Sequence, residues 1–198
     1  AIEVEAQVLA ERGERGDAIA LLRKDLVAYR STSIRTRIQK NINMLALEGK
    51  PAPPLEEREY LGLKPATLAS LRGKPVLLFF WAHWCGDCKE EGPILAQIEK
   101  EYANKRLKVV APTQRYGYVA RGEEAGPADE LKYIDEIRHK FYGDLLNVPA
   151  PISEENFKNY GASTTPTLVL IDRQGIVRMY HPGRMTLEEI RTALNKLG

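Results

Sequence analysis

The 198-residue chain contains only two cysteines, has almost no net charge and lacks a long apolar run. Its 29 Lys and Arg side chains nearly balance 27 Asp and Glu, so the charge does not indicate nucleic acid or an anionic membrane as a partner. No apolar stretch reaches the roughly 18 residues that a membrane-spanning helix needs. Because a chain of this length can bury a full core, a disulfide scaffold is not required for its stability.

Residues 1–48 carry the apolar spacing of helices. Ile34, Ile38 and Ile42 fall on one helical face, and a similar pattern precedes them. The sequence therefore predicts two or three short helices, packed as an extra layer on the main domain. No repeat of fixed period follows, which argues against a helical-repeat array.

The proline-rich stretch PAPP at residues 51–54 separates this helical segment from the rest of the chain. Proline ends a preceding helix and favours an extended, stiff connection. We therefore place a domain boundary here, between a helical extension at residues 1–50 and a second domain at residues 51–198.

The second domain alternates between strand and helix patterns. The run VLLFFW is continuous and apolar, as expected of a strand buried on both faces. The expected strands cover residues 76–81, 107–111, 167–171 and 176–180. The expected helices cover residues 87–102, residues from Pro127 to a stop at Gly143 with Phe141 facing inward, and residues 186–197 with a Thr186/Glu189 capping box. The sequence thus predicts an α/β fold, with a central sheet flanked by helices.

The two cysteines stand together in the motif WCGDCK, residues 84–89. The motif follows the first predicted strand and lies in the first turn of a helix, where free backbone N–H groups and the helix dipole stabilise an anion. This environment favours the thiolate at Cys85. Two intervening residues bring Cys88 within disulfide reach, so the pair can close and reopen. We expect Cys85 to be the nucleophile and Cys88 the resolving thiol.

A zinc site and a structural disulfide are the alternatives for this pair. Zinc normally takes four ligands. The chain has no second cysteine pair, and the remaining candidate ligands are His83, His139 and His181. Redox chemistry is favoured over both alternatives, so no metal site is expected.

The stretch VLLFFWAHWCGDCKEEGP, followed far downstream by TTPTLVLID, resembles the thioredoxin superfamily and, within it, the TlpA/ResA-like thiol:disulfide oxidoreductases. Trp84, the cysteine pair, Pro93 and a Thr-Pro before a strand occur in the family's order. The stretch LASLRGKPVLLFFWA also resembles the approach of that subfamily to its first core strand. The resemblance covers about residues 52–197 and implies a thioredoxin-like fold.

The resemblance also implies roles for residues outside the cysteine pair. Pro166 corresponds to the family's cis-proline, and its loop, with Thr165, would face the cysteines and offer backbone hydrogen bonds to an extended substrate. Trp84 would form an apolar shelf for that substrate. Glu91 corresponds to an acidic residue of the active-site helix and could exchange a proton with Cys88, while a solvated helix carboxylate is the alternative.

Two positions depart from the family's pattern. Thioredoxins place a buried aspartate in the core strand before the motif, where this chain has Phe79. Glu91 is then the carboxylate that is left to assist Cys88. Asp87 stands where the family most often has proline, and its negative charge would disfavour the Cys85 thiolate, against the helix dipole.

A long loop at residues 112–127 leaves the carboxyl end of a strand, where sites form in open α/β sheets. It mixes basic and aromatic side chains. It could line the cysteine site, form a solvated surface loop or bind a phosphate, and the last is disfavoured because no further basic stripe supports it. His83 could perturb Cys85 electrostatically, but an exposed side chain at a strand end is the favoured interpretation.

Together these features predict a thiol:disulfide oxidoreductase, which exchanges the Cys85/Cys88 dithiol with disulfides of partner proteins and works as a reductase supplied by an electron donor. No cofactor beyond the cysteine pair and no nucleic-acid partner is expected. The rival hypothesis is a thioredoxin-fold binding module with little redox turnover, which would hold a partner with residues 1–50 and the 112–127 loop.

The compartment is inferred from the resemblance alone, which implies an exported protein, periplasmic or otherwise extracytoplasmic. The chain opens with AIEVEA rather than with Met and a signal-like stretch. We therefore expect a trimmed or processed form, and a signal or an anchor would lie outside this sequence.

Overall fold

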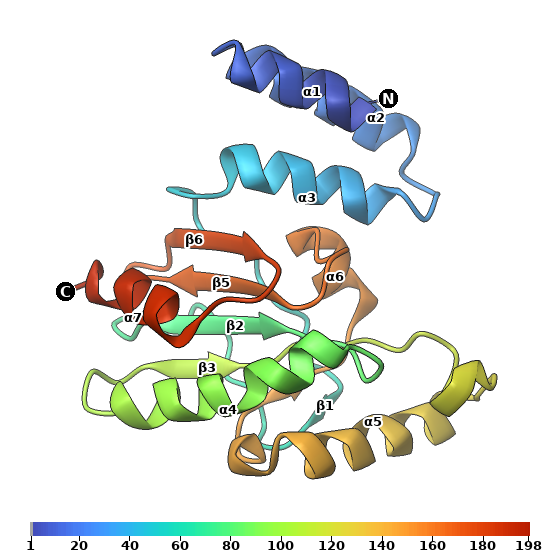
Figure 1. Cartoon of the computed structure of the whole chain (residues 1–198), viewed down its shortest axis with the longest axis vertical. Coiled ribbons are helices and arrows are strands. Elements are labelled where there is room, and N and C mark those ends of the chain that lie inside the picture. Colours follow the sequence, from blue (N-terminus) through green and yellow to red (C-terminus); the bar gives the residue numbers. More distant parts are fainter. Residues whose placement is uncertain (1) are drawn as a thin grey trace.

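The computed structural model describes residues 2–198. A four-stranded sheet lies at the centre, helices pack on both of its faces, and three N-terminal helices lie beyond one of its edges (Figure 1). The expected α/β fold with a central sheet and an N-terminal helical segment is confirmed. Within residues 2–198, no helix is long and apolar enough to cross a membrane.

The central sheet has the strand order β3-β2-β5-β6. The strands are β2 at Val76–Phe80, β3 at Lys108–Val110, β5 at Thr167–Ile171 and β6 at Val177–Pro182. β3 runs parallel to β2, whereas β5 is antiparallel to both β2 and β6. Every residue of β2 and β5 is buried, because helices cover both faces of these strands. The four expected strands are confirmed, with ends shifted by one or two residues.

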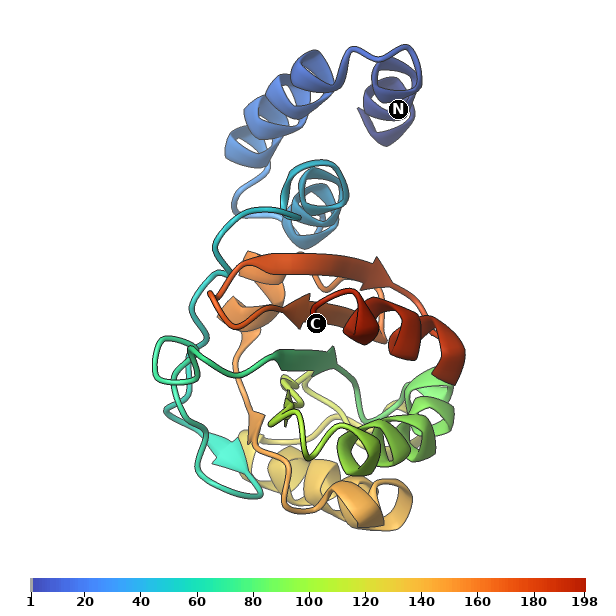
Figure 2. The ribbon, with the colours of Figure 1, turned by 90° about the vertical axis from the view of Figure 1, so that its left-hand side faces the viewer.

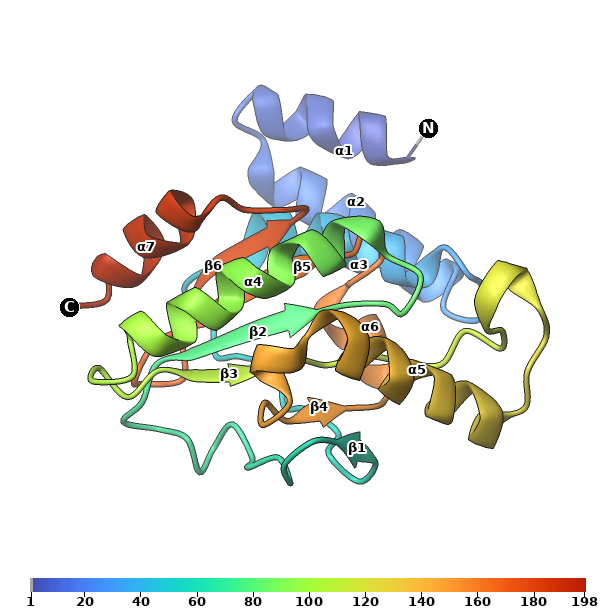
Figure 3. The ribbon, with the colours of Figure 1, turned by 60° about the horizontal axis from the view of Figure 1, so that its bottom comes forward.

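Alternate residues of β2 belong to two separate cores, as the period of a strand requires. Leu77 and Phe79 pack in a core with residues of α4 (Gly86–Glu101), α5 (Pro127–Phe141) and α7 (Leu187–Asn195). Figure 3 shows α4 and α7 on this face of the sheet. Phe80 faces the opposite side, where Phe157 and Tyr160 of α6 (Glu154–Tyr160) contact its ring.

The start of α7 agrees with the prediction from the sequence, whereas the end of α5 differs from it. The expected capping box is present, since Thr186 and Glu189 bond each other's backbone amides at the start of α7. Helix α5 ends at Phe141, and Gly143 opens a short 3-10 turn, η2 at Gly143–Leu145, instead of ending the helix. The prediction that Phe141 faces inward was wrong. Its ring is exposed, and the Lys89 ammonium lies 4.7 Å from the ring centroid.

Short elements not predicted from the sequence tie the loops to the sheet. Strand β1 at Tyr60–Leu61 pairs with β4 at Ala150–Pro151, which links the segment before β2 to the segment after α5. A 3-10 turn, η1 at Ala120–Gly122, lies within the long loop. Each is only two or three residues long, so the pattern of its own sequence carries no signal.

The N-terminal helices are α1 at Ile2–Glu11, α2 at Arg15–Ala28 and α3 at Arg35–Ala46. They share a small core of their own, in which Leu22 of α2 packs with Ile38 and Ile42 of α3. Figure 2 shows α3 between the α1–α2 pair and the sheet. The expectation of two or three short helices packed as an extra layer is confirmed.

Helix α3 docks closely on the main domain. In the turn that follows α3, the Gly49 amide donates to the Val177 carbonyl at 2.8 Å, and the Glu48 carboxylate accepts from the Tyr180 amide at 3.1 Å. Gly161, at the C-terminus of α6, approaches the backbone of α3 so closely that a Cβ atom there would lie 2.3 Å from the Lys40 nitrogen. The contact between extension and main domain is therefore made by backbone as well as by side chains.

Candidate active site

The cysteine pair lies at the N-terminus of α4, directly after β2. Cys85 and Cys88 form a disulfide with their Cα atoms 5.3 Å apart. Cys85 is the N-cap residue of the helix, and the Cys88 amide donates to its sulfur at 3.0 Å. A helix N-terminus of this kind stabilises negative charge on the sulfur when the pair is reduced. Both cysteines are almost completely buried, and only a small part of the Cys85 side chain is open to a partner.

The loop before β5 faces the cysteines. Phe80, at the end of β2, pairs with Thr167, at the start of β5, so the antiparallel register brings the two flanking loops to the same end of the sheet. The Thr165–Pro166 peptide is cis. The Cys85 sulfur lies 3.4 Å from the Thr165 carbonyl oxygen. Trp84 is 49% exposed beside the pair, which leaves an aromatic surface open to a partner.

Glu91 is completely buried, one helical turn after Cys88. Burial raises the pKa of the Glu91 carboxyl to about 7, although the Met185 amide and the Arg184 guanidinium favour its charged form. The Met185 amide donates to the two carboxylate oxygens at 3.3 and 3.4 Å. Cys88 and Glu91 are both buried on one face of α4, as their i, i+3 spacing allows. The alternative of a solvated helix carboxylate was wrong.

Arg184 was not singled out from the sequence. It lies in the loop between β6 and α7, where its guanidinium pairs with Glu90 and comes within 3.9 Å of Glu91 and 4.0 Å of Asp87. A positive charge therefore stands beside Asp87 and offsets the negative charge that we expected to disfavour the Cys85 thiolate. Because the two residues are almost a hundred positions apart, no local pattern could have indicated this pair.

His83 is buried, and the prediction of an exposed side chain was wrong. It is 1% exposed, and its Nε2 atom lies 3.4 Å from Oε1 of Glu130, which is buried as well. The rings of Tyr116, Tyr118 and Tyr133 surround it with centroids 5.3 to 5.6 Å away. Burial lowers the pKa of His83, while the Glu130 carboxylate opposes this shift.

Glu130 also anchors the long loop. Its carboxylate accepts the Tyr116 amide at 2.5 Å and the Gly117 amide at 2.9 Å. The Tyr116 ring in turn meets the Trp84 ring edge to face, with centroids 5.5 Å apart. The 112–127 loop therefore lies against the cysteine site, which favours a lining loop over a solvated surface loop. Glu130 was not predicted from the sequence, because a single glutamate in a polar helix turn has no distinguishing pattern.

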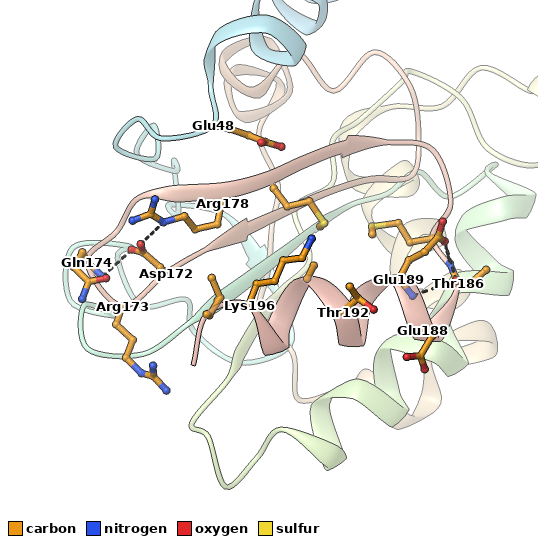
Figure 4. A pocket seen from close by; sticks show the side chains of 14 residues that line it. Glu48, Asp172, Arg173, Gln174, Arg178, Thr186, Glu188, Glu189, Thr192 and Lys196 are labelled. Carbon is orange, nitrogen blue, oxygen red and sulfur yellow. Dashed lines mark hydrogen bonds and ion pairs between the residues drawn. The ribbon is translucent and has the colours of Figure 1, made fainter.

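A hollow of about 960 Å³ lies elsewhere, between the β5–β6 hairpin and α7 (Figure 4). Neither cysteine lines it. Its Asp172 carboxylate is paired with Arg178 at 2.6 Å, and its Thr186 and Glu189 form the helix cap. Within residues 2–198, no three His, Cys, Asp or Glu side chains gather where they could hold a metal ion. We assign the candidate active site to the cysteine pair, where the N-terminus of α4, the cis-proline loop and the exposed Trp84 ring meet.

Comparison with known proteins agrees with this geometry. The profile of a thioredoxin-like domain matches residues 66–198. The chain belongs to the thioredoxin-like family. The match covers the sheet, the cysteine pair and the cis-proline loop of this thioredoxin-like protein, while its three N-terminal helices lie outside the matched residues.

Several relatives of this thioredoxin-like protein carry redox names. It is 30% identical over 149 residues to the thioredoxin-like protein YneN of Bacillus subtilis. The alignment covers 75% of this chain and 79% of the relative. It is 31% identical to a thiol:disulfide interchange protein DsbE of Xylella fastidiosa, with 75% and 68% covered. It is 30% identical to the thiol-disulfide oxidoreductase ResA of Bacillus thuringiensis, with 75% and 78% covered.

Solved structures show the same fold. The crystal structure of a DsbE-like protein from Chlorobium tepidum aligns with a TM-score of 0.55 at 27% identity, over 76% of this chain and 98% of that protein. The exposed lipoprotein thioredoxin Etrx1 of Streptococcus pneumoniae aligns with the same TM-score and identity, over 73% and 100%. Both alignments leave about a quarter of this chain unmatched.

Proposed function

We propose that this protein is a thiol:disulfide oxidoreductase that reduces disulfides in partner proteins. The observation that carries the proposal is the position of Cys85. Its sulfur caps helix α4, lies 3.4 Å from the Thr165 carbonyl and stands beside the exposed Trp84 ring. The names of the DsbE and ResA relatives support the same chemistry.

The reaction begins from the reduced pair and proceeds in two exchanges. The Cys85 thiolate attacks one sulfur of the partner's disulfide, so that a mixed disulfide forms and the partner's other sulfur leaves as a thiolate. Cys88 then loses its proton and attacks the Cys85 sulfur, which releases the partner's second sulfur. The partner gains two electrons from the pair and two protons, one of which Cys88 gave up and one of which comes from water, and the Cys85–Cys88 disulfide is restored.

Glu91 supplies the base for the second exchange. Its carboxyl group is buried beside Cys88 on α4, with a pKa of about 7, so that near neutral pH it can both accept and return a proton. Phe79 occupies the core-strand position without any titratable group, and Glu91 is the carboxyl near the start of α4 that is buried together with Cys88. Arg184 and the Met185 amide hold the carboxylate in place.

The partner binds across the two loops that meet at the end of the sheet. The exposed Trp84 ring offers apolar contact area to the segment around the target cysteine. Thr165 and Pro166 present their backbone next to the Cys85 sulfur. An extended segment can pair with that backbone as an added strand does, which recognises main chain rather than particular side chains.

The reducing direction requires a dithiol donor that returns two electrons to the Cys85–Cys88 disulfide. We place this cycle outside the cytoplasm, as the name of the pneumococcal exposed lipoprotein suggests for its own case. For a reductase we expect a reduction potential near that of thioredoxin, roughly −270 mV. Equilibration of the protein with dithiothreitol buffers, followed by Trp fluorescence, measures it. A value near −120 mV would mean that the protein oxidises its partners instead.

Single cysteine variants test the mechanism directly. We expect Cys88→Ser to accumulate a mixed disulfide between Cys85 and a disulfide-containing partner, because the resolving thiol is missing. Cys85→Ser should form no such adduct. Non-reducing gels and intact mass measure both. If a variant with both cysteines replaced keeps the cellular role of the protein, the rival hypothesis of a binding module holds and the proposal is wrong.

A further inference from the structure

A second feature of the active-site face comes from the N-terminal helices. A hollow of about 560 Å³ opens beside Trp84 and Thr165. One of its walls is the connection between α2 and α3 together with the start of α3, residues 30–36. Figure 1 shows this connection at the same end of the molecule as the start of α4. The helical extension therefore reaches the site of the proposed chemistry, although the thioredoxin-like profile does not include it.

Two residues of this hollow each carry a buried polar atom without a hydrogen-bond partner. Within residues 2–198, neither the Arg35 Nη1 atom nor the Thr165 Oγ1 atom has one. Both residues line the hollow. Buried polar groups in folded proteins are nearly always paired, and a buried guanidinium nitrogen is among the most costly to leave alone. The rest of the described chain therefore leaves a hydrogen-bonding group unused on each of two residues that line the hollow.

The free charge in the hollow is positive. Lys158 is engaged by Glu154 at 3.1 Å and by Glu155 at 2.8 Å, so this lysine and the carboxylate on the wall offset each other. Within the part of the chain that the structure describes, Arg30 and Arg35 take part in no ion pair. Guanidinium groups bind carboxylates with two parallel hydrogen bonds, which makes a carboxylate the matching ligand.

We propose that residues 30–36 complete the substrate groove, and that Arg30 and Arg35 bind acidic side chains next to the target cysteine of the partner. This inference rests on the proposed function. The occupant is a polypeptide segment because the hollow adjoins Thr165, whose carbonyl lies 3.4 Å from the Cys85 sulfur. A segment that delivers its cysteine to Cys85 places the flanking residues in the hollow. The protein would then prefer disulfides with Asp or Glu beside the cysteine.

The test uses two synthetic peptides, each with one cysteine joined by a disulfide to 2-mercaptoethanol. In one peptide two Glu flank the cysteine on each side, and in the other Gln replaces every Glu. Single-turnover reaction with the reduced protein is followed by Trp fluorescence. Each rate constant is divided by that of the same peptide with dithiothreitol, which removes the intrinsic reactivity of the disulfide. We expect about a 10-fold preference for the acidic peptide at low salt, reduced at 0.5 M salt.

Arginine variants assign the preference to the hollow. In the double variant Arg30→Gln/Arg35→Gln we expect the preference to fall to about 2-fold or less, while the neutral peptide reacts as before. The control is Arg23→Gln, which removes the same charge from an exposed position of α2 outside the hollow and should keep the full preference. Equal rates for the two peptides, or a preference that persists in the double variant, would overturn the inference.

The same experiment separates this inference from the proposed function. Bis(2-hydroxyethyl) disulfide is small and uncharged and needs no groove, so its reduction tests the cysteine chemistry alone. We expect both the double variant and the Arg23→Gln control to reduce it at the rate of the unmodified protein. If the protein reduces neither this compound nor either peptide, the proposed function itself is wrong. If it reduces all of them without an acidic preference, only the role of residues 30–36 is wrong.

Discussion

Two glutamates near the cysteine pair, Glu91 and Glu130, are completely or almost completely buried. Glu130 accepts two backbone amides and faces His83. Glu91 accepts one backbone amide, with Arg184 at a longer distance. A buried carboxylate with few partners keeps its proton more firmly, which is why burial raises the pKa of Glu91 to about 7. Both residues are glutamates, but their surroundings suit Glu130 to anchoring the loop and Glu91 to exchanging a proton.

The raised pKa of Glu91 predicts how stability depends on pH. Between pH 4.5 and pH 7 the folded protein holds a proton that the unfolded chain has lost, so the free energy of unfolding should fall as the pH rises through this window. Glu91→Gln keeps the size of the side chain and removes its titration. We expect this variant to be more stable than the unmodified protein at pH 8, by up to about 3 kcal/mol, and similar at pH 4.5.

Urea denaturation of the oxidised protein at pH 4.5, 6 and 8 measures this effect, since no thiol titrates in that form. The control is Glu136→Gln, which removes an exposed carboxylate from α5. Equal pH dependence in the Glu91→Gln variant and the unmodified protein would show that Glu91 is charged in the folded state at neutral pH. Its role as the base for Cys88 would then lose its support.

Elements far apart in the sequence are held together at single points. The long loop is fastened to α5 where Glu130 accepts the amides of Tyr116 and Gly117. Glu130→Gln keeps one acceptor oxygen and sets its NH2 group against the other loop amide, so we expect a loss of about 1–3 kcal/mol in stability. We also expect altered Trp fluorescence, because Tyr116 packs on Trp84.

The matched control for this loop variant is Asp129→Asn, an exposed neighbour on the same helix. It should change the free energy of unfolding by less than about 0.5 kcal/mol. A Glu130→Gln protein with the stability and the Trp emission of the unmodified protein would contradict the anchoring role.

Helix α3 and helix α6 meet at Gly161. This residue has a φ of +61°, and a Cβ atom would lie 2.3 Å from the Lys40 nitrogen and 2.6 Å from the Lys40 Cα. Gly161→Ala therefore combines backbone strain with a collision against backbone that cannot move aside alone. We expect a loss of roughly 2–4 kcal/mol, which urea denaturation measures.

Gly73→Ala provides the control for the strain alone. Gly73 also has a positive φ, of +86°, but a Cβ atom there would meet nothing within 4 Å. We expect this variant to lose only about 1–2 kcal/mol. Equal losses at the two glycines would mean that α3 moves away from the added methyl group at no cost. Its docking on α6 would then contribute little to stability.

The parts of the molecule should differ in how well they protect their backbone amides from hydrogen exchange. Helices α1 and α2 bury only Ala6, Ala18 and Leu22, whereas β2 and β5 are buried along their entire length. Local opening is easiest where few apolar groups are buried. We expect amides of α1 and α2 to exchange hydrogen at least about 100-fold faster than those of β2 and β5.

Hydrogen exchange followed by mass spectrometry checks this prediction, and it also tests the expected division at residue 50. A sharp change in protection between α3 and the segment after residue 50 would support a separate helical extension. Uniform protection from α1 to β6 would instead mean that the chain opens as one unit, and the boundary predicted at the prolines would be wrong.

Much of the fold was accessible from the sequence for a local reason. The apolar runs VLLFF and TLVLI are short and β-rich, which favours buried strands over helices, and the position of WCGDCK after the first of them placed both cysteines at a helix N-terminus. Thr186 and Glu189 lie three residues apart, so their cap could be predicted. Phe141 could not be placed correctly, because helical spacing does not tell which apolar residue at the edge of the face is covered.

By itself, the sequence determined the order of the four central strands and the longer helices, the cysteine motif and the resemblance to thioredoxins, because each of these rests on short local patterns. Only the tertiary structure decided that Glu91 and His83 are buried, that Arg184 stands beside Asp87 and Glu91, and that residues 30–36 reach the site. Burial and charge pairing depend on which distant segments meet in space, and packing of the whole chain sets those meetings.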